Sequence, residues 1–276
     1  MEVDFMAVYS DEKIEFVQWK SHSYSDKMPV AHYHNKHELY YLEKGRTKYF
    51  IGNKIYLLKP GDMVFVPKGV FHQTDGESTG VNVERFLLVF DDDFVGEDYL
   101  KYIDELKADN HIRFRQDIKY KTNEVFRKIE SEDRNRHKDY FEMERIYLKE
   151  LLILISRYRI RDDTIKLSQG YSIIQNAATY ISDNYDSDLS LEFLSAKFAM
   201  SPSHFSKQFK SVTGIGLSEY INISRISAAE KLLSKTNMPI TEIATRCGFN
   251  DSNYFAAVFK KLKGITPKKF SSMAKA

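Results

Sequence analysis

The segment 239–270 most constrains how this chain can fold, because it predicts two short helices joined by a tight turn. Small apolar side chains recur at helical spacing and share one face of the first helix: Ile240, Ile243, Ala244 and Cys247. Gly248 ends that helix, since glycine has the backbone freedom that a tight turn requires. Asn250 and Asp251 are both suited to cap the second helix. The pattern is that of a helix-turn-helix.

The second helix of this segment has an apolar face and a basic face. We expect four residues to point inward: Tyr254, Phe255, Val258 and Phe259. We expect three to point outward: Lys260, Lys261 and Lys263. A polar, basic outer face on the second helix favours a DNA-binding unit.

The same pattern occurs a second time, fifty positions upstream. Four residues recur at that offset: Phe205, Phe209, Lys210 and Gly214 match Phe255, Phe259, Lys260 and Gly264. Ser201 and Pro202 form a good N-cap and first turn for the second helix of this copy. A continuous amphipathic helix over 217–236 is predicted to bridge the copies. We therefore expect an all-α domain with two helix-turn-helix units.

These residues resemble the DNA-binding domain of the AraC/XylS family of transcription regulators, over roughly the last hundred positions. The resemblance rests on matches in the bridging helix and the second unit: Arg225, Ile226, Ala229, Leu232, Leu233, Ile243, Ala244, Gly248, Phe249, Tyr254, Phe255, Phe259, Lys260, Lys261, Gly264, Thr266 and Pro267. It implies a sequence-specific DNA-binding transcription regulator, usually an activator, with promoter or operator DNA and RNA polymerase as partners.

Positive charge is concentrated where this pattern lies. Residues 171–276 carry 13 Lys and Arg against 8 Asp and Glu, whereas residues 1–170 carry 28 against 31. Phosphate binding requires such a concentration. No apolar run reaches the length of a membrane span, and the start, Met1 to Asp4, lacks the layout of a signal peptide. The single Cys247 excludes an internal disulfide, so we expect a soluble cytoplasmic protein without a membrane partner.

Residues 5–90 contain short apolar runs, which favours antiparallel strands. The runs are Lys13–Trp19, Glu38–Leu42, Lys48–Ile51, Lys54–Leu58, Met63–Val66 and Asn82–Phe90. Gly- and Pro-containing breaks separate several of them. Evenly spaced short strands predict a sandwich or small barrel, such as a jelly roll.

Four of the eight histidines in the chain cluster within residues 32–72 of this region: His32, His34, His37 and His72. In a strand, His32 and His34 point the same way, and Glu38 and Tyr40 share their parity. His37 has the opposite parity, so we expect it to be exposed. Imidazoles and a carboxylate suit a divalent transition metal, and polar groups inside a barrel suit a small-molecule pocket.

Two strings in this region resemble the sequence motifs of the cupin superfamily. One comprises His32, His34, Glu38 and Gly45, and the other comprises Gly61, Pro67, Gly69 and His72. Gly76 stands where the second motif commonly ends in Asn. In metal-dependent cupins, the matching residues hold one divalent ion: His32, His34, Glu38 and His72. In AraC-type regulators such residues also contact an effector, which implies an effector site with these four and Tyr40; a sugar is one candidate effector.

Three interpretations of the barrel are open at this stage. It binds an effector, it serves only to dimerise the regulator, or it is a metal-dependent cupin enzyme. We do not expect an enzyme, because no separate base or nucleophile is recognisable and an enzyme needs no duplicated DNA-binding pattern.

From Asp91 onward the sequence favours helices, at Phe94–Lys107, Ile118–Arg134 and Phe141–Arg159. The last is so apolar that it must bury two faces, one on the barrel and one on its own chain or on a second subunit. The family resemblance favours a homodimer. We expect an α+β chain of two domains with these parts: a cupin-like jelly-roll barrel at 1–90, a helical dimerisation region at 91–160, a linker at 161–170 and the double helix-turn-helix domain at 171–276.

Base reading is expected from the early outward positions of each recognition helix. These are Ser203, Ser206 and Lys207 in the first copy, and Ser252 and Asn253 in the second. Lysine suits guanine and asparagine suits adenine. Phosphate contacts are expected from Lys210, Lys260, Lys261, Lys268 and Lys269.

Three residues of this domain, at two places, depart from the family pattern. Ala256 and Ala257 stand where the family frequently has a hydroxyl and an arginine, so the second copy should discriminate less between bases. Ala199 stands where a turn glycine is expected, and a left-handed backbone there costs alanine about 1 kcal/mol.

Overall fold

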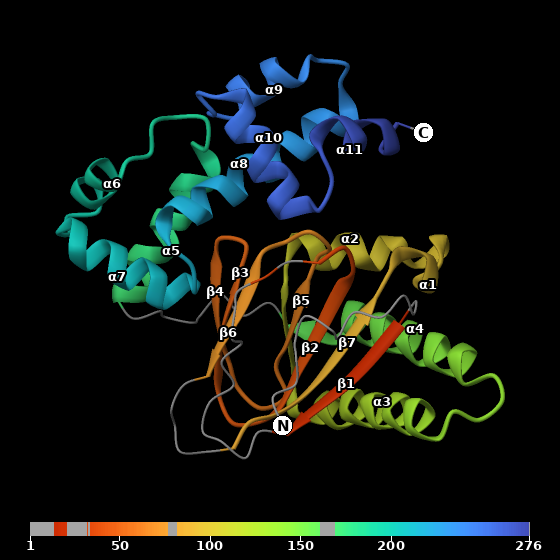
Figure 1. Ribbon diagram of the computed structural model, residues 1–276. Coiled ribbons are helices and arrows are strands. Elements are labelled where there is room, and N and C mark those ends of the chain that lie inside the picture. Colours follow the sequence, from red (N-terminus) through yellow and green to blue (C-terminus); the bar gives the residue numbers. More distant parts are fainter. Residues whose placement is uncertain (1–13, 21–31, 33, 77–81, 161–168, 276) are drawn as a thin grey trace. The chain divides into compact units, whose positions relative to one another are not determined.

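A computed structural model describes residues 14–20, 32, 34–76, 82–160 and 169–275 (Figure 1). The chain divides into two compact units, 1–52 with 56–166, and 53–55 with 167–276. Most of the linker predicted at 161–170 lies outside the described residues.

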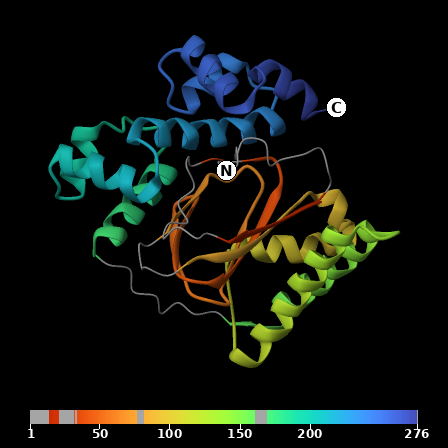
Figure 2. The same ribbon diagram turned by 60° about the horizontal axis from the view of Figure 1, so that its bottom comes forward.

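The first unit contains two sheets, whose neighbouring strands run antiparallel (Figures 1 and 2). The larger has the order β1 (Ile14–Lys20), β7 (Glu84–Phe90), β2 (His37–Lys44), β5 (Met63–Val66), β8 (His111–Phe114), β9 (Arg159–Ile160). The smaller has the order β4 (Lys54–Leu58), β3 (Thr47–Ile51), β6 (His72–Gly76). A buried apolar layer joins their inner faces: Tyr40, Leu42, Tyr49, Ile51, Tyr56, Leu58, Val64, Val66, Val83, Leu87 and Val89. The predicted β-rich, cupin-like region is therefore present as two facing sheets.

Helices cover the other face of the larger sheet (Figure 2). They are α1 (Asp92–Val95), α2 (Leu100–Ala108), α3 (Gln116–Asn135) and α4 (Tyr140–Tyr158), with the 3₁₀ turn η2 (Glu97–Tyr99). The single helix predicted over Phe94–Lys107 is wrong, because Gly96 has a φ of 85° and separates α1 from the turn that follows. The chain alternates along β2, so that Leu39 and Tyr41 face the helices while Tyr40 and Leu42 face the second sheet.

This covered face corrects one expectation about the histidines. His37 is fully buried, although its parity opposite to Glu38 is as predicted, because helices rather than water cover its side of the sheet. Its Nε2 donates to Asp92 Oδ1 at 2.8 Å, and its Nδ1 accepts from the backbone nitrogen of Lys68 at 3.1 Å. His37 therefore ties the start of β2 to α1 and to the loop before β6.

From residue 169 onward the second unit is helical, as predicted. Its helices are α5 (Gln169–Asp183), α6 (Leu191–Lys197), α7 (Pro202–Thr213), α8 (Leu217–Lys235), α9 (Ile240–Arg246), α10 (Ser252–Lys263) and α11 (Pro267–Met273). The bridging helix α8 contributes to two cores. Near its start Tyr220 packs edge-on against Phe209 with ring centroids 5.3 Å apart, and further along Ala229 and Leu233 join the core of α9 and α10. Among the helices that the structure describes, none combines the length and apolarity of a membrane span.

Candidate functional site

The two recognition helices present the same faces. Residues 201–210 and 251–260 have identical patterns of exposure, position by position. Phe205 and Phe255 are fully buried, as are Phe209 and Phe259 four residues later, which fixes both helices in the same orientation on their cores. The duplication seen in the sequence is thus a duplication of exposed surface as well as of core.

The predicted DNA contacts lie mainly on the exposed faces of these helices. Four of the five base-reading candidates are exposed: Ser203, Lys207, Ser252 and Asn253. Ser206 is half-buried, which limits its reach. All five phosphate candidates are exposed: Lys210, Lys260, Lys261, Lys268 and Lys269.

Two expectations about α10 are wrong. Tyr254 points outward, with 54% of its surface exposed, and its hydroxyl accepts a 3.0 Å hydrogen bond from Asn222 Nδ2 on α8. Lys263 does not extend into solvent but forms a 2.8 Å ion pair with Glu230, because the last turn of α10 lies against α8. Helical spacing within α10 cannot reveal these contacts, because they depend on where α8 lies in the fold.

Side-chain caps begin both recognition helices. Ser201 Oγ accepts from the backbone nitrogen of His204 at 3.4 Å, and Asp251 Oδ1 accepts from that of Tyr254 at 2.7 Å. These bonds satisfy amides that the helix itself leaves unpaired. The first turns, which carry Ser203, Ser252 and Asn253, are therefore held in place before any ligand binds.

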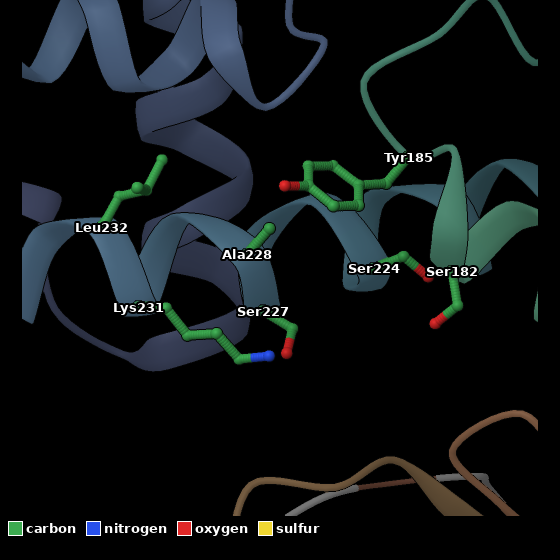
Figure 3. A pocket seen from close by; sticks show the side chains of 7 residues that line it. All are labelled: Ser182, Tyr185, Ser224, Ser227, Ala228, Lys231 and Leu232. Carbon is green, nitrogen blue, oxygen red and sulfur yellow. The ribbon is translucent and has the colours of Figure 1, made fainter.

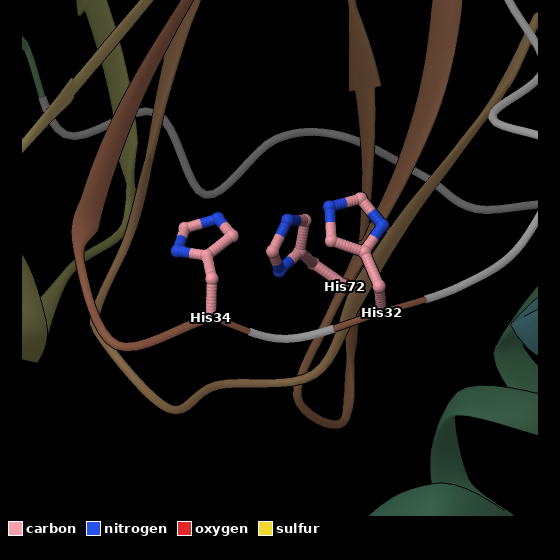
Figure 4. A group of neighbouring side chains, drawn as sticks. All are labelled: His32, His34 and His72. Carbon is pink, nitrogen blue, oxygen red and sulfur yellow. The ribbon is translucent and has the colours of Figure 1, made fainter. Parts of the chain in front are cut away.

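The second candidate site is the histidine cluster of the first unit (Figure 4). His32 and His72 exchange two backbone hydrogen bonds, of 3.1 and 2.9 Å, and their ring centroids lie 4.5 Å apart. His34 lies just before β2, with its ring centroid 5.0 Å from that of His72. One nitrogen from each of the three rings lies within 4.8 Å of the others. His34 thus reaches the cluster from outside a strand, contrary to the parity argument that placed it within one.

The tautomers of this cluster follow from its backbone contacts. His34 Nδ1 donates to the carbonyl of Lys36 at 2.8 Å, and His72 Nδ1 donates to that of Val70 at 2.9 Å. A carbonyl can only accept, so each Nδ1 carries a proton and each Nε2 is left for the cluster. The Nε2 of His72 is buried and has no hydrogen-bond partner among the described residues.

Glu38 supplies the negative charge at the centre. Its Oε2 lies 3.3 Å from His34 Nε2 and 3.5 Å from His72 Nε2, and its Oε1 accepts a 2.5 Å hydrogen bond from the Tyr49 hydroxyl. Burial alone would raise the pKa of Glu38, but the charge of His72 and the hydrogen bond from His34 outweigh it, so the pKa lies well below its usual value. Burial and the Glu38 carboxylate raise the pKa of Tyr49 well above its usual value.

This arrangement favours a cation. Two neutral imidazoles would direct lone pairs at a carboxylate, which also offers only lone pairs. Either a second proton on a ring or a metal ion between the donors removes the repulsion. Three imidazole nitrogens and one carboxylate form a donor set that divalent transition metals accept. The residues present therefore fit a metal ion.

Tyr40 stands behind this cluster rather than in it. It is fully buried, packs edge-on against Tyr49 with ring centroids 5.0 Å apart, and lies under the guanidinium of Arg85. Nothing in the order of residues along the chain reveals that the Tyr49 hydroxyl meets Glu38. The informative signal would have been its position on β3, which faces β2 across the interior.

The second unit contains a pocket of about 270 Å³ between α8 and the end of α5 (Figure 3). Hydroxyl groups, one ammonium and two apolar side chains line it: Ser182, Tyr185, Ser224, Ser227, Ala228, Lys231 and Leu232. It lies in the helical unit and shares no residue with the histidine cluster.

Comparisons with known proteins match both parts of the chain in which these sites lie. A family model described as a helix-turn-helix domain matches residues 194–273, and a cupin domain model matches residues 24–89. A curated relative named HTH-type transcriptional activator RhaR, from Mannheimia succiniciproducens, is 24% identical over 282 residues, covering 94% of this chain and 98% of its own. The chain belongs to the AraC/XylS family of transcription regulators.

Other similarities of this AraC/XylS regulator are more local or more distant. An uncharacterized HTH-type transcriptional regulator in the cgkA 5′ region of Pseudoalteromonas carrageenovora is 42% identical over 98 residues, which covers 36% of this chain and 58% of that protein. The solved structure of ToxT from Vibrio cholerae O395 is 14% identical, covers 96% of this chain and 99% of its own, and has a TM-score of 0.39. Such a TM-score supports no further argument. The family assignment establishes a DNA-binding transcription regulator.

Proposed function

We propose that this AraC/XylS regulator activates transcription in response to a small molecule that binds between the sheets of its first unit. The observation that carries the proposal is the buried cluster of Glu38 with three imidazoles, in which the buried Nε2 of His72 lies 3.5 Å from Glu38 Oε2 and has no hydrogen-bond partner among the described residues. A buried polar group without a partner is costly, so its retention favours a ligand. Named relatives are activators, which supports the sign of regulation.

A divalent transition metal is the first ligand we propose for the cluster. His32, His34, Glu38 and His72 would hold it, since the assigned tautomers direct the Nε2 atoms of His34 and His72 at the carboxylate, which is ionised. Such an ion would act as a Lewis acid that anchors oxygen atoms of an effector. A polyhydroxylated molecule such as a sugar has those oxygens, and Tyr40 and Tyr49 would support the site from behind.

For DNA reading, we assign the exposed starts of α7 and α10. Ser203, Ser206 and Lys207 contact bases from the first helix, and Ser252 and Asn253 contact them from the second. The lysines already named as exposed contact phosphates, which positions both helices without specifying sequence. Ala257 occupies the place of Lys207 in the second helix and cannot hydrogen-bond, so the first helix discriminates more strongly.

We further propose a homodimer formed through the helical region 91–160. On α4, Leu148, Leu151 and Leu152 are buried within the chain, whereas Ile146 is 54% exposed. Ile153, seven residues further and on the same face as Ile146, is half-buried. A second subunit would cover this stripe, and the assembled dimer would contact RNA polymerase at a promoter.

The test of the effector site measures what the protein carries. Purified protein, His72→Ala and His32→Ala are compared by elemental analysis and native mass spectrometry, with His137→Ala as the matched control because His137 is exposed. We expect one metal ion or small molecule per chain, retained by the control and lost from both cluster variants.

Two other outcomes of these measurements would favour the alternative functions of the first unit. If all four proteins carry nothing and bind DNA equally, the first unit is a dimerisation scaffold and the effector proposal fails. Oxygen uptake by the metal-loaded protein, abolished in His72→Ala, would instead point to an enzyme.

A further inference from the structure

The two helix-turn-helix units touch each other directly, in addition to being joined by α8. The loop 184–190, between α5 and α6, belongs to the first unit of the pair, and the turn after α9 belongs to the second. A Cβ atom on Gly248 would lie 2.9 Å from Asp186 Cα and 2.9 Å from the Tyr185 carbonyl oxygen. The loop and the turn are therefore packed backbone against backbone, at a distance that only glycine allows.

A single side chain bonds to both partners of this contact. Arg225 Nε donates to the Tyr185 carbonyl at 2.8 Å, and its Nη2 donates to the Ser187 carbonyl at 2.9 Å. On the other side, its guanidinium carbon lies 5.6 Å from the ring centroid of Phe249, in a cation–π contact. Arg225, whose backbone belongs to α8, thus joins the loop 184–190 of the first helix-turn-helix to the turn after α9 in the second helix-turn-helix.

A second polar link lies one turn earlier on α8. Asn222 Nδ2 donates to the hydroxyl of Tyr254, in the first turn of α10. On the loop side, Figure 3 shows the ring of Tyr185 lying along α8 beside Ala228. Together these contacts support the packing of the two helix-turn-helix units from both sides of α8.

If α8 alone joined them, the two helix-turn-helix units could twist relative to each other, because each of their cores packs on a different part of that helix. Side-chain and backbone contacts between the units remove this freedom. A planar guanidinium with two bonds in fixed directions resists twisting better than a single contact does.

We propose that Arg225 is a positioning residue that holds the recognition helices α7 and α10 at one fixed separation. Base contact is not its role. Because the separation of α7 and α10 is fixed, the regulator recognises its two DNA subsites only when the correct number of base pairs lies between them. The inference rests on the proposed base reading by α7 and α10, and the two experiments below separate the failure of one from the failure of the other.

The first experiment needs no DNA. Spin labels are attached at Lys207→Cys and Ala257→Cys, two equivalent and exposed positions, and their distance distribution is measured by double electron–electron resonance. Cys247 is fully buried and remains unlabelled. We expect one narrow distribution in the parent protein and a clearly broader one after Arg225→Lys, which keeps the charge but cannot bond both carbonyls.

A matched control makes the result specific. Arg246→Lys alters an exposed arginine of the same domain, which among the described residues pairs with Glu242 along α9, and it should leave the distribution unchanged. Equal widths for Arg225→Lys and the parent overturn the proposal, as does a broad distribution in the parent. If thermal melting shows that Arg225→Lys unfolds the domain, Asn222→Ala replaces it, because this half-buried residue lies outside the cores.

The second experiment uses DNA selected by the parent protein from a random pool. One inserted base pair between the subsites moves them apart by roughly 3.4 Å and about a tenth of a turn. We expect the parent to lose about tenfold or more in affinity, comparable to a mismatched base, and Arg225→Lys to lose much less. Equal losses for both proteins overturn the proposal. If the parent protein selects no sequence at all, the proposed base reading is wrong, and the distance measurement alone decides whether Arg225 fixes the separation of the two helices.

Discussion

Ala199 and Gly248 occupy the same place in the two helix-turn-helix turns, two residues after the first helix of each unit, and both have a left-handed backbone, with φ of 53° and 81°. The left-handed conformation expected at Ala199 is therefore present. Glycine adopts it freely, while alanine brings its Cβ close to the following carbonyl. The first helix-turn-helix consequently tolerates backbone strain that the second helix-turn-helix avoids.

Ala199→Gly should stabilise the DNA-binding unit. Removing the strained Cβ is expected to raise the free energy of unfolding by about 1 kcal/mol, less the entropy that glycine loses on folding. Urea unfolding followed by circular dichroism measures the change. Gly248→Ala is the matched reverse variant and should destabilise by more, because its Cβ would also collide with the backbone of Asp186. A loss of stability on Ala199→Gly would contradict this reading of the turn.

Cys247 should react slowly with alkylating reagents. Burial, and to a smaller extent Asp186, raises the pKa of its thiol to about 11, although Arg225 opposes the shift. The reactive thiolate is then on the order of one part in a thousand at pH 8. Iodoacetamide labelling followed by mass spectrometry should show a rate far below that of glutathione, rising about tenfold per pH unit up to about pH 11. Labelling at the rate of a free thiol at pH 8 would be inconsistent with this burial.

Tyr49→Phe should weaken metal binding without removing a metal ligand. The Tyr49 hydroxyl bonds Glu38 Oε1 and so directs Oε2 toward the imidazoles. Loss of such a supporting bond typically costs 10- to 100-fold in metal affinity, roughly the drop we expect by isothermal titration with a divalent transition metal. Tyr56→Phe serves as control, because Tyr56 belongs to the same apolar layer. Equal affinities for both variants would mean that Tyr49 only packs.

The sequence predicted the helical unit better than the sheet unit, for a physical reason. Helical spacing and caps are local, so the duplicated pattern located α7 and α10 and their buried phenylalanines. Strands β6 and β8 were missed, since His72–Gly76 is polar apart from its glycine and His111–Phe114 is only four residues long. Their strand conformation depends on partners distant in the chain, β3 and β5.

The histidine cluster was predicted in its members but not in its construction. The resemblance to the cupin motifs identified His32, His34, Glu38 and His72, which meet in the interior. Parity was applied to His34 as a strand residue, yet His34 reaches the cluster from outside a strand, just before β2, where the Lys36 carbonyl sets its tautomer. The burial of His37 depends on helices that lie beyond position 90, so local periodicity did not reveal it.

Lys207→Ala should change which sequence the regulator prefers. Lys207 is exposed in the first turns of α7, whereas the equivalent position in α10 is already an alanine. Its removal is expected to cost about 1–3 kcal/mol at one base position and to relax specificity there. Affinities for a set of single-base variants of the selected DNA measure this. Uniform weakening across all sequences would reassign Lys207 to the phosphate backbone.

The central claim is that this chain binds DNA through two basic recognition helices, and the salt dependence of affinity tests it most directly. For binding to selected double-stranded DNA, the logarithm of the association constant should fall steeply and linearly with the logarithm of salt concentration. Lys260→Ala removes one exposed candidate phosphate contact and should reduce the magnitude of the slope by about 1, equally for selected and unrelated sequences. A flat salt response in the parent protein, or an unchanged slope in Lys260→Ala, would contradict the account.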